Sequence, residues 1–197
     1  NAGIVTVCSG GNGKDGEPRT DNIYPADFDE CVAVTALNTD NTNCYWSDYN
    51  KKKNISAPGL LITTTNTTGG YSKASGTSMA APIVSGVFAL LFAAEPVATV
   101  DDACRAIYLT ATPIQDPVND RTKTSGSKGV VDAEKAVNYL WGLGRTAYPD
   151  VSPGDWFFDA AYFMKARGAM TGDGATGMFD PYKPMTRAMI AQVIYKD

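Results

Sequence analysis

The sequence predicts an α/β fold in which a parallel sheet is flanked by helices. Short apolar runs at residues 3–8 and 31–37 contain many β-branched residues and are bounded by Gly, Pro and Asn, which is typical of buried strands. Longer segments at about 78–94, 99–110 and 132–141 are typical of helices. Strands that alternate with helices favour a parallel sheet with helices on its faces.

Most segments between these elements are expected to be loops. Residues 10–22 are polar, and residues 38–54 carry Asn, Asp and Lys, which indicates a turn-rich hairpin region. Residues 60–65 indicate one further strand. Asp101 lies where an acidic side chain stabilises the first turn of the helix expected from residue 99.

Composition limits the possible partners. The chain has 197 residues, an apolar fraction of 44% and a net charge of −4 with both signs spread along it. These values suit one globular domain or two small ones, and they argue against a nucleic-acid-binding surface. No apolar run reaches about 18 residues, so we expect no membrane span.

The four cysteines lack the spacing of a metal site. Cys8 and Cys31 lie in strand-like segments, where buried free thiols are common. If a disulfide forms, Cys8 and Cys31 are the first expected pair because neighbouring strands would bring them close, and geometry alone decides the outcome.

The most informative segment spans residues 76–86 and reads G-T-S-M-A-A-P-I-V-S-G. The small residues around Ser78 leave room for a substrate backbone, and Pro82 has a φ angle suited to the first turn of a helix. We therefore expect Ser78 at a helix N-terminus, where backbone N–H groups favour a developing negative charge. A helix start in a loop of small residues, without catalytic function, is the plainer alternative.

Residues 76–86 closely resemble the nucleophile motif of the subtilisin-like serine peptidases (subtilases), G-T-S-M-A-x-P-x-V-x-G. Further segments resemble the family in its chain order; they lie at 3–13, 24–26 with 31–36, 46–47, 55–59 and 127–133. The resemblance implies a partial subtilase-type parallel sheet with flanking helices over residues 1–146.

The same resemblance implies the roles of individual residues. Ser78 would be the nucleophile, and the Asn12 side chain would hold the oxyanion. Thr77 would support the turn before Ser78. Three residues would line the S1 pocket and pair with the substrate backbone: Ser9, Gly10 and Gly11. Protein or peptide substrates follow as partners. Calcium is possible by resemblance, although no cofactor-binding or metal-ligating residues can be identified in the sequence.

The chain contains no histidine, whereas the subtilase triad runs Asp, His, Ser. Ile83 also stands where the family usually has His after the proline of the nucleophile motif. We expect a C-terminal part of a longer peptidase that is inactive alone. A catalytically dead wall-bound scaffold or binding protein is one alternative. A sedolisin-like peptidase is another, disfavoured by Asn12, where that family has Asp, and by Met79.

A second unit is expected over residues 147–197, after a short flexible joint at 142–146. Its segments resemble the S-layer homology (SLH) pattern F-x-D-V, W-x-x-x-A-I, G-x-x-x-G, F-x-P and T-R-A-E; they lie at 148–151, 156–161, 168–172, 179–181 and 186–189. Apolar residues at helical spacing from Trp156 to Met164, and Thr186 as the cap of a helix through Val193, predict a small all-α module.

The SLH resemblance implies binding to pyruvylated cell-wall polysaccharide. Arg187 suits an anionic sugar because its guanidinium makes bidentate charge-assisted bonds, and Trp156 offers a flat face to a sugar ring. A surface salt bridge for Arg187 and a packed Trp156 in a helical hairpin are the plainer alternatives. Both resemblances together imply a secreted protein attached to the wall or surface of a Gram-positive type of bacterium.

Overall fold

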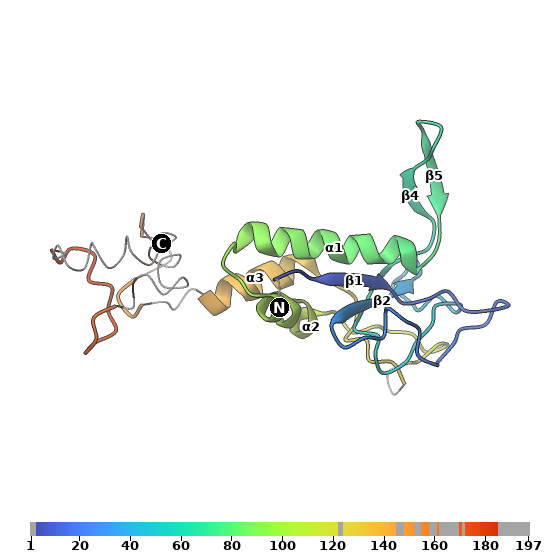
Figure 1. The fold of residues 1–197 in the computed structure, drawn as a ribbon, viewed down its shortest axis with the longest axis horizontal. Helices are drawn as coiled ribbons and strands as arrows, with labels where there is room; N and C mark the ends of the chain where they lie inside the picture. The colour runs from blue at the N-terminus through green and yellow to red at the C-terminus, as the bar shows by residue number, and fades with distance from the viewer. Residues whose placement is uncertain are drawn as a thin grey trace.

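The fold is built around a small parallel sheet (Figure 1). The computed structural model describes residues 3–121, 124–144, 148–151, 155–157, 161, 170 and 172–184. Its elements in chain order are β1 (Thr6–Ser9), β2 (Cys31–Leu37), β3 (Ile55–Pro58), β4 (Ile62–Thr65), β5 (Tyr71–Ala74), α1 (Thr77–Ala94), α2 (Val100–Thr110) and α3 (Ala133–Gly144).

Strand β2 is the centre of the sheet. It pairs in parallel with β1 on one side and β3 on the other, with Val7 opposite Val32 and Val34 opposite Ile55. All its residues after the first are buried, as expected for a strand covered on both faces. The α/β class with a parallel sheet and flanking helices is therefore confirmed.

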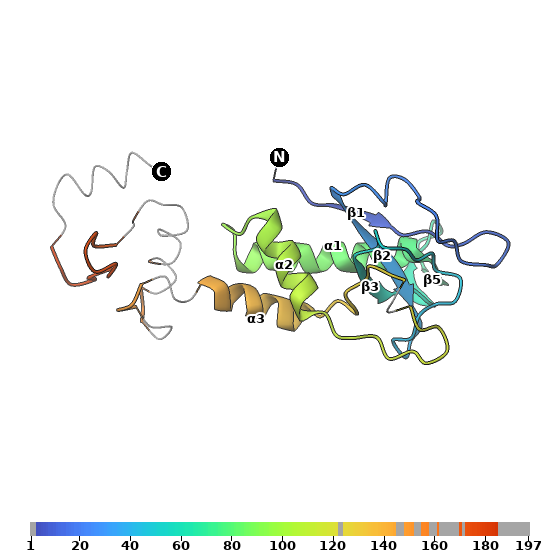
Figure 2. The same ribbon diagram turned by 90° about the horizontal axis from the view of Figure 1, so that it is seen from below.

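Helix α1 covers one face of this sheet. Val84 and Leu91 are fully buried in the same hydrophobic cluster as Val34 of β2. Helices α2 and α3 pack beside each other, and α3 also contacts α1 (Figure 2). On the opposite face, Ser56 shares 2.6 Å hydrogen bonds with the hydroxyls of Thr35 and Ser127. This second face therefore contains buried hydroxyl groups beside apolar residues such as Leu37, which is fully buried.

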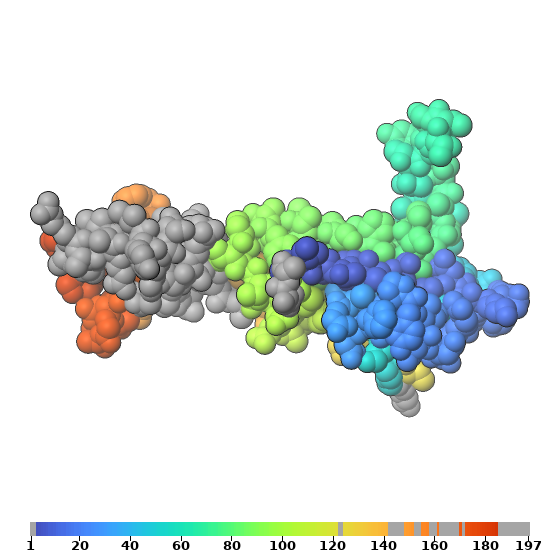
Figure 3. All heavy atoms as spheres, viewed as in Figure 1, coloured from blue at the N-terminus to red at the C-terminus, as the bar shows by residue number. Residues whose placement is uncertain are grey.

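The side of α1 away from the sheet is open. Leu90 is 54% exposed, and Ser85, Gly86 and Ala89 are exposed with it. Figure 3 shows α1 uncovered along its length beside the projecting β4–β5 hairpin. Among the described residues, no strand pairs with the outer edge of β1. An apolar helix face and an open strand edge therefore lie on the surface of this chain.

By length and composition alone, α1 is also apolar enough to cross a membrane. The expectation that no segment of this kind exists is corrected to that extent. Core helices of soluble proteins pass the same test. The buried residues of α1 share one hydrophobic cluster with β2 and β3, which is the packing of a core helix.

Several expected boundaries change in the structure. Strands β3 and β5 were not predicted from the sequence. The expected turn-rich hairpin region at 38–54 begins with a short turn closed by an antiparallel bridge between Leu37 and Asn43, and the rest of it forms turns. Pro82 lies inside α1 rather than in its first turn, so the Ser78 carbonyl lacks the backbone N–H that residue 82 would otherwise donate to it.

Helix α3 continues through Gly144, so the expected flexible joint at 142–146 is partly helical.

The helix α2 begins with a reciprocal cap. The Thr99 hydroxyl accepts from the Asp102 N–H, and the Asp102 carboxylate accepts from the Thr99 N–H. Asp101 and Asp102 lie in the first turn, which confirms the predicted acidic start of this helix.

All four cysteines are free. Cys8 and Cys31 do lie on the neighbouring strands β1 and β2. Burial raises the pKa of the Cys8 thiol, with the Cys31 thiol adding to the effect. Burial also raises the pKa of Cys44 to about 11. Thiols held protonated in this way are poor nucleophiles, which is the behaviour of structural cysteines.

The described residues after 147 have a separate apolar cluster. Tyr148, Val151, Phe157 and Ala161 are buried together, and Phe179 packs against them. The Asp150 carboxylate accepts from the backbone N–H groups of Phe179 and Asp180. The predicted helical positions Phe163 and Met164 and the helix from Thr186 to Val193 lie outside the described residues.

Candidate active site

The candidate nucleophile lies where the N-terminus of α1 meets the end of β1. Ser78 is the second residue of α1 and is exposed, whereas Thr77 before it is fully buried. Gly76 precedes them with a φ angle of 154°, a conformation that L side chains rarely adopt. The expected placement of Ser78 at a helix N-terminus is therefore observed, with a glycine that the turn requires.

Thr77 fixes the orientation of the Asn12 side chain. The backbone N–H and the hydroxyl of Thr77 both donate to Asn12 Oδ1, each at 2.8 Å. Because Oδ1 is occupied by these two donors, the Nδ2 amine of the exposed Asn12 side chain remains as the donor for another group.

Two hydrogen-bond donors lie around Gly76. A Cβ atom placed on Gly76 would lie 3.4 Å from Asn12 Nδ2 and 3.7 Å from the Ser78 backbone nitrogen. Both nitrogens, together with Asn12 Oδ1 at 3.8 Å, therefore lie around the position that a side chain on residue 76 would take. Donors arranged in this way can stabilise an oxyanion that forms beside Ser78.

Ser9, Gly10 and Gly11 lead from β1 to Asn12. Ser9 is exposed, whereas Gly10 is buried and donates its N–H to Val34 O at 2.8 Å. A Cβ at Gly10 would lie only 2.7 Å from that oxygen, so no larger residue fits. The Gly11 N–H donates to Thr77 Oγ1 at 3.1 Å. This segment therefore lies against the start of α1, and its contact with substrate remains a prediction.

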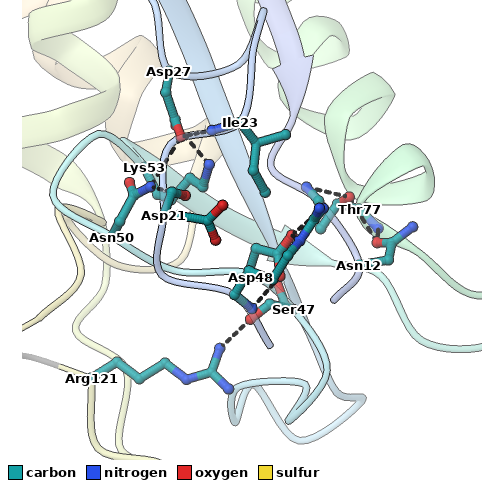
Figure 4. A network of polar contacts seen from close by, with 12 residues as sticks. Asn12, Asp21, Ile23, Asp27, Ser47, Asp48, Asn50, Lys53, Thr77 and Arg121 are labelled. Carbon is teal, nitrogen blue, oxygen red and sulfur yellow. Dashed lines mark hydrogen bonds and ion pairs between the residues drawn. The ribbon is translucent and has the colours of Figure 1, made fainter. Parts of the chain in front are cut away.

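A polar network supports this corner of the fold (Figure 4). Lys53 Nζ donates to Asp27 Oδ1 at 2.6 Å, and both side chains are fully buried. Burial opposes ionisation of Asp27, but hydrogen bonds from Lys53, Asn50 and the Ile23 N–H outweigh it and lower the pKa of its carboxyl. This pair joins the loop at 23–27 to the segment before β3.

A second part of the network lies closer to Asn12. The Asp48 backbone N–H donates to Gly11 O at 3.0 Å, and the Asp48 carboxylate accepts from Arg19. Sequence reasoning missed Asp48, Asp27 and Lys53. For Asp48 and Lys53 the only signal was a charged residue in a segment expected to be a turn-rich loop, and it does not reveal which residues pair.

No metal centre is evident in the described part of the chain, where no three His, Cys, Asp or Glu side chains are grouped to hold an ion. The calcium that the family resemblance allows has no such side-chain cluster there, and we propose no calcium site. A cavity of about 150 Å³ lies beside Asn43, Asp116 and Arg121, and neither Ser78 nor Asn12 lines it.

Of the two predicted wall-binding residues, the structure describes only Trp156. Trp156 is 90% exposed and meets Phe157 edge-on with ring centroids 5.5 Å apart. Most of the Trp156 surface is thus exposed to solvent rather than packed in a core. Arg187 lies outside the described residues, so its role stays a prediction.

Comparisons with known proteins agree with this geometry. The model of the subtilase family matches residues 1–144, and the model of the S-layer homology domain matches residues 147–189. Thermitase of Thermoactinomyces vulgaris is 35% identical over 139 residues, which is 71% of this chain and 46% of that protein. The major intracellular serine protease of Bacillus subtilis (strain 168) is 41% identical over 90 residues, 45% of this chain and 28% of that protein.

A solved structure gives the same result. The prenylagaramide maturation protease PagA superposes with a TM-score of 0.61 at 26% identity, covering 70% of this chain and 51% of its own. The chain thus spans about half or less of the length of these relatives. The chain belongs to the subtilase family, which its residues 1–144 match, and an S-layer homology domain follows at 147–189.

Proposed function

We propose that residues 1–146 are the C-terminal part of a serine endopeptidase domain and that Ser78 is its nucleophile. The observation that carries the proposal is the joint position of Ser78, Thr77 and Asn12. An exposed serine at a helix N-terminus adjoins two hydrogen-bond donors, one of them oriented by Thr77.

In the full-length protein, Ser78 Oγ attacks the carbonyl carbon of the scissile peptide bond. A histidine supplied from outside this chain takes the hydroxyl proton and then donates it to the leaving amine. The Ser78 N–H and Asn12 Nδ2 hold the oxyanion. Such a donor contributes about 3–4 kcal/mol to the transition state, a figure known from a subtilisin rather than obtained from this structure.

Substrate binding falls to the segment before Asn12. Ser9, Gly10 and Gly11 line one side of the S1 pocket and pair with the backbone of a peptide substrate. The exposed Ser9 and the tight fit of Gly10 against Val34 support this role, because the segment offers backbone groups on a rigid support.

The 197-residue chain alone is inactive under this proposal. It has no histidine, and a serine hydroxyl without a base is a weak nucleophile. That same absence favours the second candidate, a catalytically dead wall-bound scaffold. The two differ in what full-length protein does: a peptidase hydrolyses peptides and loses all activity in Ser78→Ala, and a scaffold hydrolyses none.

The role of Asn12 is tested by steady-state kinetics on the full-length protein. Asn12→Ala should lower kcat about 100-fold or more and change KM little, because the oxyanion forms only in the transition state. Asn66→Ala, in the turn between β4 and β5, is a matched control that should leave both constants unchanged. Equal losses in kcat and 1/KM for Asn12→Ala would reject its assignment.

We further propose that residues 147–197 bind anionic cell-wall polysaccharide and hold the protein at the surface of a Gram-positive type of cell after secretion. The match to the SLH model and the exposure of the Trp156 side chain support this role. Arg187 would pair with the acidic groups of the sugar.

A further inference from the structure

We propose that Asp48, held by Arg19, positions the oxyanion donor Asn12. The inference rests on the proposed peptidase function and adds a positioning residue to that same site. Asp48 does not reach Asn12 itself. It acts through Gly11, whose carbonyl accepts from the Asp48 N–H at 3.0 Å.

The Asp48 carboxylate is fixed by three donors from one residue. Oδ1 accepts from the Arg19 backbone N–H at 2.6 Å, and Oδ2 accepts from Arg19 Nε at 3.3 Å and Nη2 at 3.1 Å. The Asp48 side chain is only 1% exposed, whereas that of Arg19 is 39% exposed. A carboxylate so enclosed needs this guanidinium, because a buried charge without a partner is strongly unfavourable.

The same carboxylate packs directly against Gly11. A Cβ on Gly11 would lie 2.1 Å from Asp48 Oδ2, so the carboxylate occupies the space that any other residue at position 11 would fill. Gly11 also has a φ angle of 107°, which favours glycine. Charge, shape and backbone conformation therefore fix Gly11 against Asp48.

From Gly11 a short hydrogen-bond relay runs to the site. The Gly11 N–H donates to Thr77 Oγ1 at 3.1 Å, and that hydroxyl donates to Asn12 Oδ1 at 2.8 Å. Both polar groups of the Gly11 backbone are thereby hydrogen-bonded, the carbonyl to Asp48 and the N–H to Thr77. A shift of Asp48 displaces Gly11 and with it the amide plane of Asn12.

Arg121 holds the turn that carries Asp48 from the other side. Its Nη1 donates to Ser47 O at 2.7 Å and its Nη2 to Tyr45 O at 2.8 Å, and its guanidinium lies 4.2 Å from the centre of the Tyr49 ring. Figure 4 shows Arg121, Ser47 and Asp48 on this side, with Thr77 and Asn12 beyond them. The turn is therefore a rigid support for the carboxylate.

The kinetic test uses full-length protein and a double-mutant cycle. Asp48→Asn keeps the shape and removes the charge, so we expect kcat to fall about tenfold with KM within about twofold. In an Asn12→Ala background the same change should alter kcat by less than about twofold, because the donor that Asp48 positions is gone. Arg19→Lys should give a smaller loss than Arg19→Gln.

Asp29→Asn is the matched control, since the Asp29 carboxylate is exposed and pairs with Lys52. It should leave kcat unchanged. An Asp48→Asn effect of equal size with and without Asn12 would overturn the proposal, because Asp48 would then act only on general stability.

A second readout does not depend on activity. The sample is the 197-residue chain carrying Leu90→Glu, a change on the exposed side of α1 that should reduce association. Amide hydrogen exchange, followed by NMR, should be at least about tenfold faster at Gly11 when Asp48→Asn is added, with Gly10 unchanged because its N–H bonds Val34 O. Equal acceleration at both amides, or none at Gly11, would overturn the proposal. If the full-length protein hydrolyses nothing, the peptidase function fails, and the exchange result still decides whether Asp48 holds Gly11.

Discussion

Thr77 holds Asn12 by two hydrogen bonds to one atom, since its backbone N–H and its hydroxyl both end on Asn12 Oδ1 at 2.8 Å. One residue therefore sets both the start of α1 and the direction of the amide beside Ser78. The same hydroxyl also accepts a hydrogen bond from the Gly11 N–H.

Removal of that hydroxyl should damage catalysis more than substrate binding. In the full-length protein, Thr77→Val should lower kcat about tenfold with KM within about twofold, because Asn12 loses one of its two orienting donors. Thr77→Ser keeps the hydroxyl and should stay within about threefold of the parent kcat. Equal kcat values for the two variants would contradict this role of the hydroxyl.

The buried pair of Lys53 and Asp27 should govern stability. Lys53→Met leaves the Asp27 carboxylate buried without its ammonium partner, and we expect a loss of about 3 kcal/mol or more in the free energy of unfolding. Urea unfolding at pH 7 measures it. Lys52→Met is the control, because the Lys52–Asp29 pair is exposed and its removal should leave the midpoint nearly unchanged. Similar midpoints for both variants would show that the buried pair is not needed.

The open face of α1 should make the isolated chain associate. Leu90 lies on that face and is 54% exposed, so the 197-residue chain should form oligomers in light scattering, and Leu90→Glu should reduce them. Leu109→Glu is the control, since Leu109 is 66% exposed on another helix, α2, and its change should not alter the result. A parent chain that is a clean, cooperative monomer would count against an incomplete peptidase domain.

Wall binding should depend on the SLH domain. In pull-downs with purified walls, Arg187→Ala and Trp156→Ala should each weaken binding of the full-length protein, as should chemical removal of pyruvyl groups from the polysaccharide. Lys135→Ala in α3 removes a cation outside this domain and serves as the control. Binding unaffected by all three treatments would exclude the proposed recognition.

The sequence predicted the features that local pattern determines. β1, β2 and the three helices follow from apolar runs, and the position of Ser78 follows from the small residues before an apolar helix. β3 has only four residues, among them Ser56, which is buried through its hydroxyl bonds rather than by an apolar side chain. Periodicity therefore could not reveal it.

The charged pairs around the site could not be predicted from the sequence for a different reason. Asp48 and Arg19 are 29 residues apart, and Lys53 and Asp27 are 26 apart. Each charged residue resembles a solvated loop residue until the fold brings its partner to it. Only the family resemblance pointed to Asn12, and the hydrogen bonds from Thr77 supply the physical reason for its orientation.

The central claim is that Ser78 is a peptidase nucleophile whose base lies outside this chain. The most direct measurement is the site and rate of labelling by a fluorophosphonate probe, followed by mass spectrometry, in full-length protein and in the 197-residue chain. The account predicts one label per full-length molecule, on Ser78 and absent in Ser78→Ala, with weak or no labelling of the chain alone. Rapid stoichiometric labelling of the isolated chain, or a full-length protein that is never labelled at Ser78, would contradict it.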